Sequence, residues 1–589
     1  MNLAKRASSR DRIFLFALIL LGFGSLHAQN PTIFTAPAVP LGSRVVFELH
    51  GVPGQPYVFD ASVSGTSPGT FVGPGLTVPL NRPFLLLDLF QGVLPAGGVL
   101  SGFAGAFDMN GDARAEIQLP DIEGFDGLVL SGVVATLDPF APFGIGGVSP
   151  AADTRIVRPG TAMAGNAAPF LASTAVPAGL AVRYVAPTGS DLQNGLTPAT
   201  AWRQISHAVN QVGPGTVIEV ADGAYAGPVL IQNLAGTIGA PLVVRATGAG
   251  AVLTGSGSTN NTNKNSIFIG SSSWVTIEGL KVYGSQRAGC RVSLSHHVTI
   301  RNSVFGNHQK WGIFTDYADD LVLVGNECFG SIDEHGIYCS NSSDRNVIVG
   351  NWCRDNNASG IQINADPAFL APIGGYVPDG ISSHCVVERN RLTNNGVIGG
   401  AALNMASLRD SVIRNNVVTN SLWLNSSGIA LWDDAAGAQW GSMRNLIEAN
   451  TIAYDSGRGR FCITIMNGSI GNTIRNNVLR GGRRGALTWT LDSLPGLRSD
   501  GNLMWSVDSW PILVRDDVFQ SFTLAQWQAT GQDIHSIHAA PVFAQPAGLD
   551  WSLLPGTPGH DAAVFAATVL DHQGTPRGAN PPDMGAYER

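Results

Sequence analysis

An asparagine returns at nearly regular intervals along the second half of the chain, each time after a short β-branched segment. The recurring residues are Asn302, Asn326, Asn351, Asn390, Asn416, Asn450 and Asn477. Their separations are 24, 25, 39, 26, 34 and 27 residues. Self-similarity at such a period is the signature of a solenoid, in which each repeat packs only on its neighbours.

A repeat of 24 residues has room for two or three short strands joined by tight corners. If the turns stack about 4.8 Å apart, each backbone group pairs with the turns above and below it. An Asn at the same corner of every turn can then bond its neighbours through the side-chain amides. Leucine-rich repeats share this period but need Leu at fixed offsets, where this chain has Ile, Val, Ala and Cys. The pattern therefore predicts an all-β chain built as a parallel β-helix.

A Gly-Ile pair recurs before the asparagines and predicts the register of one sheet. In a strand, alternate side chains point to opposite faces, so Ile337, Ile361, Ile429 and Ile463 are expected to point inward on one stacked sheet. The two longest asparagine intervals place loop insertions at residues 365–381 and 433–443. Insertions on a solenoid emerge from one face and often form the wall of a binding groove.

Changes in composition predict four segments. Residues 1–28 have basic residues before an apolar core and a small-residue cleavage site, which is the pattern of a signal peptide. Residues 29–158 alternate short apolar runs with turn residues roughly every 8–12 positions, which favours a small β-sandwich domain. Residues 159–180 are rich in Ala, Pro and Gly, as linkers are. Residues 181–589 are expected to form the β-helix with its N-terminal and C-terminal caps.

Charge and cysteine content limit the partners. The net charge of −8 and the absence of a basic run argue against nucleic-acid binding. After the signal segment no apolar stretch is long enough to span a membrane, and we expect an exported monomer. Residues 281–484 nevertheless carry 18 Lys and Arg against 16 Asp and Glu, which permits an acidic ligand. Cys328 and Cys353 each follow a repeating Asn by two positions, so they should be neighbours on adjacent turns.

Several motifs resemble those of secreted bacterial right-handed parallel β-helix proteins, the pectate-lyase-like superfamily. They include residues 184–191 and 194–200, the amphipathic stretch 205–212, the Glu334-His335-Gly336-Ile337-Tyr338 segment, the asparagine repeat and the ending at 583–588. The resemblance covers roughly residues 181–589. It implies a right-handed β-helix with a polysaccharide as partner. The group includes lyases, epimerases, hydrolases and members without known activity. The polygalacturonase-like hydrolase pattern is not reproduced, since Asp319-Asp320 and His335-Gly336 are not followed by the remaining motifs.

The same strand register predicts a polar patch on the outside of adjacent turns. A lyase acting on a uronate needs a base that removes the proton beside the carboxylate, an acid for the leaving oxygen, and a group that neutralises the carboxylate. Lys310 or His335 is a candidate base, and Tyr338 is a candidate acid. Substrate-binding candidates are Arg291, Trp311, Gln362 and Asn364.

The acidic residues of this patch leave alternatives open. Asp316, Glu334 and Asp366 could instead bind Ca²⁺, which prefers oxygen ligands. Asp316 and Glu334 are also the best available carboxylate pair for a glycoside hydrolase. The favoured hypothesis is a secreted carbohydrate-active protein that cleaves a uronate-containing anionic polysaccharide by β-elimination. The alternatives are a non-catalytic carbohydrate-binding or cell-surface β-helix protein and a glycoside hydrolase.

Overall fold

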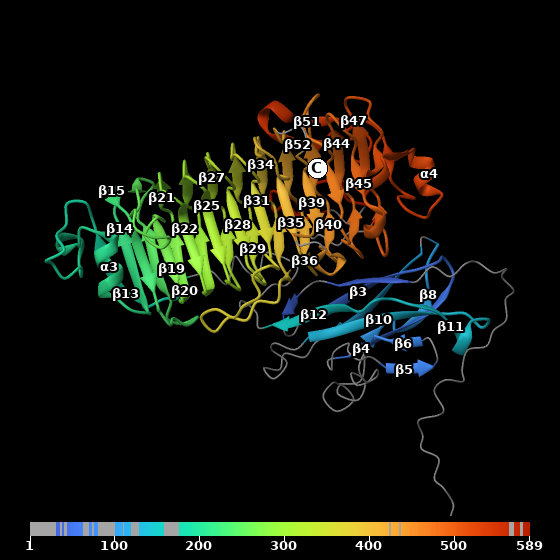
Figure 1. The fold of residues 1–589 in the computed structure, drawn as a ribbon, viewed down its shortest axis with the longest axis horizontal. Helices are drawn as coiled ribbons and strands as arrows, with labels where there is room; N and C mark the ends of the chain where they lie inside the picture. Colours follow the sequence, from blue (N-terminus) through green and yellow to red (C-terminus); the bar gives the residue numbers. More distant parts are fainter. Residues whose placement is uncertain are drawn as a thin grey trace, which may run out of the picture.

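The structure is a computed structural model. It describes residues 31–35, 38–40, 44–62, 70–73, 76–79, 100–109, 111–118, 129–157, 176–422, 426–434, 437–564, 570–577 and 581–589. The predicted signal peptide lies outside these residues, as does most of the predicted linker. From residue 181 onward the chain winds into a solenoid with three long sheets (Figure 1).

Each sheet has twelve strands, one from nearly every turn, and neighbouring strands are parallel except for the last pair of sheet 3. Sheet 1 contains β13 (Ala181–Val185), β14 (Thr216–Val220), β17 (Leu242–Ala246), β20 (Ser273–Glu278), β23 (His296–Arg301), β26 (Val322–Val324), β29 (Val347–Val349), β33 (Val386–Glu388), β37 (Val412–Arg414), β40 (Leu446–Glu448), β43 (Thr473–Arg475) and β46 (Arg498–Asp500).

Sheet 2 contains β15 (Gly223–Ala226), β18 (Ala251–Thr254), β21 (Lys281–Tyr283), β24 (Val304–Gly306), β27 (Glu327–Phe329), β30 (Trp352–Arg354), β34 (Arg391–Thr393), β38 (Val417–Thr419), β41 (Thr451–Ala453), β44 (Val478–Gly481), β47 (Leu503–Ser506) and β50 (Ile537–His538). Sheet 3 contains β16 (Val229–Gln232), β19 (Ile267–Gly270), β22 (Ala288–Ser293), β25 (Trp311–Asp316), β28 (Ile337–Ser340), β31 (Ile361–Asn364), β35 (Leu403–Ala406), β39 (Ile429–Trp432), β42 (Ile463–Ile465), β45 (Leu487–Trp489), β48 (Leu513–Arg515) and β49 (Gln520–Phe522).

The asparagine ladder lies at the corner between sheets 1 and 2. It runs from Asn326 through Asn351, Asn390, Asn416, Asn450 and Asn477 to Asn502, with amide-to-oxygen distances of 3.0–3.1 Å. Each side-chain oxygen also accepts the backbone N–H of the preceding ladder residue, as between Asn351 and Asn390 at 2.9 Å. All members are buried. The ladder therefore satisfies backbone groups that would otherwise be buried without partners.

The prediction that Asn302 is the first member of the ladder is wrong. Asn302 adopts a φ of 51° and stands at the corner itself, while the next residue, Ser303, donates its backbone N–H to Asn326. Asn tolerates this left-handed conformation better than most residues, which explains why it occurs there. At the other end, Asn502 extends the ladder by a rung that the spacing did not include.

The inward register of sheet 3 is confirmed. Ile337 pairs with Ile361, and the same row continues through Leu403 to Ile429 and Ile463. All are fully buried in one continuous core that runs the length of the solenoid. Cys328 and Cys353 are likewise direct neighbours in sheet 2, as predicted, and both are free thiols.

The ends of the solenoid differ. Helix α3 (Ile205–Gln211) buries Ile205, Ala208 and Val209 against the first turns, whereas α4 (Leu524–Gln528) lies at the opposite end (Figure 1). Beyond it, β51 (Phe543–Gln545) and β52 (Asp550–Leu553) form a hairpin. The short 3-10 helices are η4 (Pro198–Thr200), η5 (Ala438–Trp440), η6 (Leu491–Ser493), η7 (Asp516–Val518) and η8 (Pro546–Gly548). Loops occupy residues 365–381 and the span between β39 and β40, where the two insertions were expected.

The N-terminal region forms small, mainly antiparallel sheets. One contains β1 (Thr32–Thr35), β3 (Arg44–His50), β9 (Asp112–Gln118) and β7 (Leu100–Ser101). The other contains β2 (Ala38–Pro40), β12 (Ala152–Val157), β10 (Val129–Leu137), β4 (Pro56–Ser62), β8 (Ala104–Ala106) and β11 (Ile145–Val148). A further pair is β5 (Thr70–Gly73) with β6 (Leu76–Val78), and η3 (Pro142–Gly144) precedes β11.

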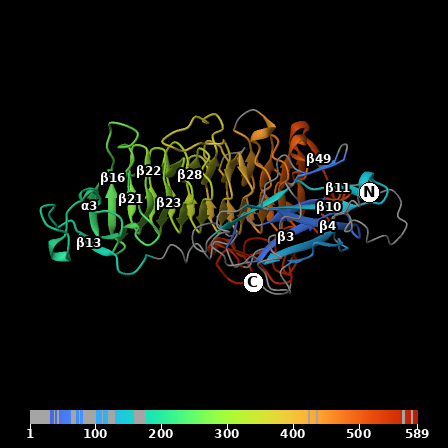
Figure 2. The same cartoon turned by 90° about the horizontal axis from the view of Figure 1, so that it is seen from below.

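The two larger N-terminal sheets share one core that includes Phe47, Phe59 and Ile117, which is the arrangement of a sandwich. Asp112 of this sandwich lies 3.6 Å from Arg498 on β46, so the sandwich borders sheet 1 at the C-terminal turns (Figures 1 and 2). In the described part of the chain no helix is long and apolar enough to cross a bilayer.

The buried isoleucine row gives a stability prediction. Because Ile361 is fully buried between Ile337 and Leu403, Ile361→Ala should lower the free energy of unfolding by about 2–5 kcal/mol. Val377→Ala, at a residue that is 73% exposed on the 365–381 loop, is the matched control and should change it by less than about 0.5 kcal/mol. Equal losses in urea unfolding of the two variants would contradict the packing.

Candidate functional site on sheet 3

The outward side chains of sheet 3 form columns along the solenoid. One column contains Phe268, Arg291, Phe314, Tyr338, Gln362 and Asn404, each paired with the next through the strand register. Two residues further along each strand, a second column contains Ser293, Asp316, Ser340 and Asn364. The stacking therefore brings together the predicted site residues of β22, β25, β28 and β31.

An aromatic cluster forms the centre of this surface. Trp311 and Phe314 stack with centroids 4.3 Å apart, and Tyr338 packs against them at 6.0 and 5.4 Å. Trp311 and Phe314 are buried, while Tyr338 is half-buried. The predicted substrate-binding residue Trp311 is thus packed under its neighbours, and it offers little open ring face for a sugar.

Arg287 lies over this cluster. Its guanidinium carbon is 4.8 Å from the Trp311 ring and 4.9 Å from the Phe314 ring, within cation–π range. Within the described residues it makes no side-chain hydrogen bond and no ion pair, and its Nη1 is buried without a partner. Burial, followed by repulsion from Arg291, lowers the pKa of Arg287 to about 10. Among the described residues this cation therefore has no paired carboxylate.

The other cations of the surface are paired. Arg291 donates two hydrogen bonds to Asp316, at 2.9 and 2.7 Å, and Ser293 donates a third at 2.9 Å. Lys310 donates to Glu334 at 2.8 Å, and the Trp311 indole donates to the other oxygen of Glu334 at 2.8 Å. An ammonium in an ion pair has no lone pair to accept a proton, so this contact does not favour Lys310 as a base.

The contacts of His335 also oppose its predicted role as base. The backbone N–H of Ser359 donates to its Nδ1 at 3.0 Å, which places the ring proton on Nε2. Nε2 faces Glu334 at 3.9 Å. Burial lowers the pKa of His335 to about 4, so the ring is neutral near pH 7 and neither nitrogen is free to accept a proton.

Tyr338 and Asp366 form the part of the surface best suited to proton transfer. The Tyr338 hydroxyl lies 3.3 Å from Asp366 Oδ2, to which Ser340 also donates at 2.7 Å. The Asn364 amide donates to the other oxygen at 2.9 Å. Burial, with the nearby Asp434 as a further cause, raises the pKa of Asp366. Burial also raises the pKa of Tyr338, so its phenol stays protonated until a partner accepts the proton.

Gln362 and Asn364 have separate partners. The Gln362 oxygen accepts from the Asn404 amide at 2.6 Å, and the Trp432 indole donates to the Asn404 oxygen at 3.0 Å. Asn364 instead holds Asp366, as its side-chain oxygen also accepts the Asp366 backbone N–H at 3.0 Å. Both predicted binding residues are buried, and they position their neighbours.

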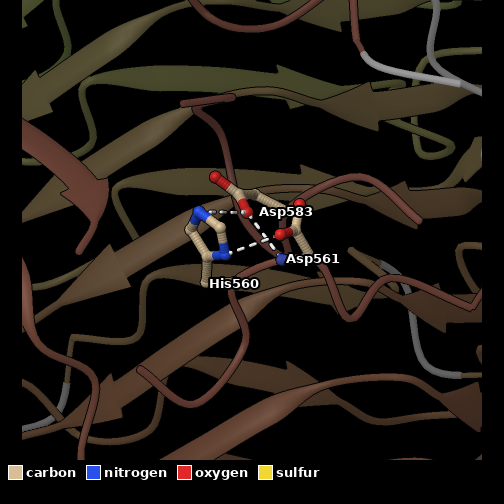
Figure 3. A group of neighbouring side chains, drawn as sticks. All are labelled: His560, Asp561 and Asp583. Atoms are coloured by element: carbon tan, nitrogen blue, oxygen red, sulfur yellow. Dashed lines mark hydrogen bonds and ion pairs between the residues drawn. The ribbon is translucent and has the colours of Figure 1, made fainter. Parts of the chain in front are cut away.

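The three predicted calcium ligands do not converge. Asp316 binds Arg291, Glu334 binds Lys310, and Asp366 binds Tyr338 and Ser340. Among the described residues, the one group of three metal-type ligands within 4.8 Å is His560, Asp561 and Asp583, far along the chain in the C-terminal segment (Figure 3). The residues of the patch therefore do not fit a bound Ca²⁺.

The carboxylate pair expected for a glycoside hydrolase is occupied as well. A hydrolase of this kind needs one carboxyl that holds a proton for the leaving group. Asp316 accepts hydrogen bonds from Arg291 and Ser293, and Glu334 accepts them from Lys310 and the Trp311 indole, so both carboxylates are already held by neighbours. This arrangement does not favour a hydrolase.

Two residues of the site were missed from the sequence. Arg287 stands three positions before the inward Cys290, as Lys310 does before Ile313, so the register alone could have revealed it. Asp434 gives no signal in the sequence, because its proximity to Asp366 depends on the path of two loops that no spacing specifies.

The buried histidines predict a loss of stability in acid. The pKa of a histidine is near 6.5 in an unfolded chain, whereas burial lowers it to about 4 for His335 and about 3 for His308. Between those values the unfolded chain binds more protons, so the free energy of unfolding should fall as pH drops, by up to ~1.4 kcal/mol per unit for each histidine.

His335→Gln should reduce the loss of unfolding free energy between neutral and acid pH. His296→Gln, at an exposed histidine, is the matched control. Urea unfolding between about pH 7 and pH 4.5 measures the effect. The prediction fails if His335→Gln retains the full pH dependence of the unchanged protein.

Comparisons with known proteins agree with the solenoid. The family model described as "Right handed beta helix region" matches residues 243–370. Among solved structures, pectate lyase Pel9A is similar at 17% identity and a TM-score of 0.44, over 69% of this chain and 96% of that one. A rhamnogalacturonan lyase is similar at 13% identity and a TM-score of 0.31, over 59% of this chain and 86% of that one. The Streptococcus pneumoniae surface protein and adhesin PfbA is similar at 12% identity and a TM-score of 0.35, over 50% of this chain and 90% of that one. No curated protein matches the chain.

The matched residues lie within a parallel solenoid that continues on both sides of them, so the chain has the fold of a parallel β-helix and residues 243–370 match its right-handed form.

Proposed function

We propose that this protein is a polysaccharide lyase that cleaves a uronate-containing chain by β-elimination on the outer face of sheet 3. The observation that carries the proposal is Arg287, a cation with no paired carboxylate among the described residues, which rests on the rings that Tyr338 also contacts. A uronate carboxylate is the anion expected there, because a guanidinium offers it two parallel hydrogen bonds.

Arg287 stands on the turn of β22 and Asp366 follows β31, three turns further along, so Arg287 would hold the carboxylate of one uronate while another uronate of the same chain reaches the Tyr338–Asp366 pair. The Asp366 carboxylate, with its raised pKa, would take the C5 proton of that second uronate. The electron pair forms the C4–C5 double bond, and the bond between C4 and the bridging oxygen breaks. The Tyr338 hydroxyl would donate its proton to that oxygen. The protonated Asp366 could then return a proton to the Tyr338 oxygen across their 3.3 Å contact, so that both residues regain their starting states.

The revised roles follow from the contacts of each candidate. Tyr338 keeps the predicted role of acid. Asp366 replaces Lys310 and His335 as base, because Lys310 is held by Glu334 and His335 has its acceptor nitrogen occupied by Ser359. We further propose that residues 1–28, with their basic and apolar parts, act as a signal peptide that directs export. The exported protein is proposed to be a monomer.

The test is incubation of the purified protein with a panel of uronate polymers while the absorbance of the unsaturated product is followed. Tyr338→Phe and Asp366→Asn should each lower kcat by at least ~10²-fold, the usual contribution of an acid or base. His335→Gln should retain most of the activity. Because Asp366 acts as a base, kcat should rise with pH as its carboxyl ionises.

Two results would contradict the proposal. Full activity of both Tyr338→Phe and Asp366→Asn would exclude this surface as the catalytic site. Binding of a uronate polymer without any unsaturated product would favour a non-catalytic carbohydrate-binding protein.

A further inference from the structure

Sheet 3 carries a second group of cations, in the same column as Arg287. The residue three positions before the first inward side chain of each strand defines this column, here called the edge column. From the turn of β22 to that of β48 it contains Arg287, Lys310, Glu334, Ala358, Gly400, Ser426, Arg460, Arg484 and Trp510. Backbone hydrogen bonds join several of its neighbours directly, as between Arg460 and Ser426 at 2.8 Å.

The C-terminal end of the edge column repeats the chemistry of its N-terminal end. The Arg484 guanidinium carbon lies 5.5 Å from the ring of Trp510 and 5.9 Å from that of Phe461. Arg460 also lies 5.9 Å from the Phe461 ring, and it forms an ion pair with Asp516. Trp510 is 42% exposed, so this cluster is open to solvent.

Arg484 has no paired carboxylate among the described residues. Its guanidinium makes no side-chain hydrogen bond and no ion pair with any described residue. Arg460 and Arg483 lie close enough to repel Arg484. Burial and this repulsion lower the pKa of Arg484. The backbone of Arg483 in turn bonds that of Arg458 at 2.8 Å, which places a fourth arginine nearby. An anion bound here would relieve the mutual repulsion of these cations.

The middle of the edge column carries no charge. Ala358, Gly400 and Ser426 separate Glu334 from Arg460. Ala358 and Ser426 are buried and Gly400 is exposed, so no charged side chain of the column stands between Glu334 and Arg460. The two cationic ends are therefore joined by an uncharged stretch of one continuous sheet.

We propose that Arg484 and Trp510 form a second binding site for an acid group of the same anionic polysaccharide, which would lie along the edge column from Arg287. This inference rests on the proposed function for the class of ligand. Lys310 and Arg460 are five ladder steps apart, which is ~24 Å at the usual strand spacing. Arg287 and Arg484 are seven steps apart, or ~34 Å. A chain must therefore exceed a minimum length to reach both ends.

The test compares oligouronates of increasing length, prepared from polygalacturonate and alginate, by titration calorimetry with the full-length protein. Arg484→Gln should weaken binding of the longest oligomers at least ~10-fold, the effect of losing one charge-assisted hydrogen bond. Binding of oligomers too short to span the column should not change. Arg484→Lys keeps the charge and should lose less than Arg484→Gln. Arg203→Gln, at an exposed arginine near the N-terminal cap, is the matched control.

The outcomes separate this inference from the proposed activity. Length-dependent loss in Arg484→Gln without any cleavage by the unchanged protein would support the second site and refute the lyase. The second site alone would be refuted if the unchanged protein cleaves the polymer but Arg484→Gln binds oligomers of every length as tightly as the unchanged protein does. Failure of the unchanged protein to bind any oligouronate would refute both.

Discussion

The register of the stacked turns is the constraint on which the rest of this structure depends. Each ladder asparagine accepts both the backbone N–H and the side-chain amide of its neighbour, as Asn390 does from Asn351. A slip of one residue would break both bonds and turn the inward isoleucines to the solvent face. Because the corner is fixed, residues at equal offsets from it form straight columns along the solenoid. The chemistry of the outer surface is therefore set column by column.

The charged columns of sheets 1 and 3 differ in how they are balanced. On sheet 1 the cations and anions alternate on the turns before Val324 and after Val349: Arg301 pairs with Glu278 at 2.9 Å and Arg475 with Glu448 at 3.0 Å. Removing one member of such a buried pair would leave an uncompensated charge, so this column is best explained as structural. On sheet 3, Arg287 and Arg484 lie over aromatic rings, while the carboxylates that attract them, Asp316 and Asp516, are paired with Arg291 and Arg460. These two arginines, which have no paired carboxylate among the described residues, thus lie on the sheet that also carries Tyr338.

The sequence was informative wherever the answer depended on offsets along the chain. The inward isoleucines, the Cys328–Cys353 neighbours and the grouping of Tyr338 with Gln362 all follow from a period of about one turn. Errors arose where one residue's contacts decided the outcome. Asn302 looks like a ladder member but occupies the corner, and His335 looks like a base but accepts a backbone N–H. Spacing does not specify hydrogen-bond partners, and it does not place Asp434 beside Asp366, because that contact joins two irregular loops.

The distance between the two cationic ends of the edge column depends on the number of turns and is independent of the number of residues. The interval from Asn351 to Asn390 is 39 residues, yet these two are adjacent rungs at 3.0 Å, as are Asn416 and Asn450 across 34 residues. The extra residues leave the solenoid as loops and add no rise along its axis. Lengthening those loops would therefore change the walls of the sheet 3 surface while the separation of Arg287 and Arg484 stayed constant. A rigid separation of this kind favours an extended ligand with acid groups repeated along it, because such a ligand can meet both ends without bending.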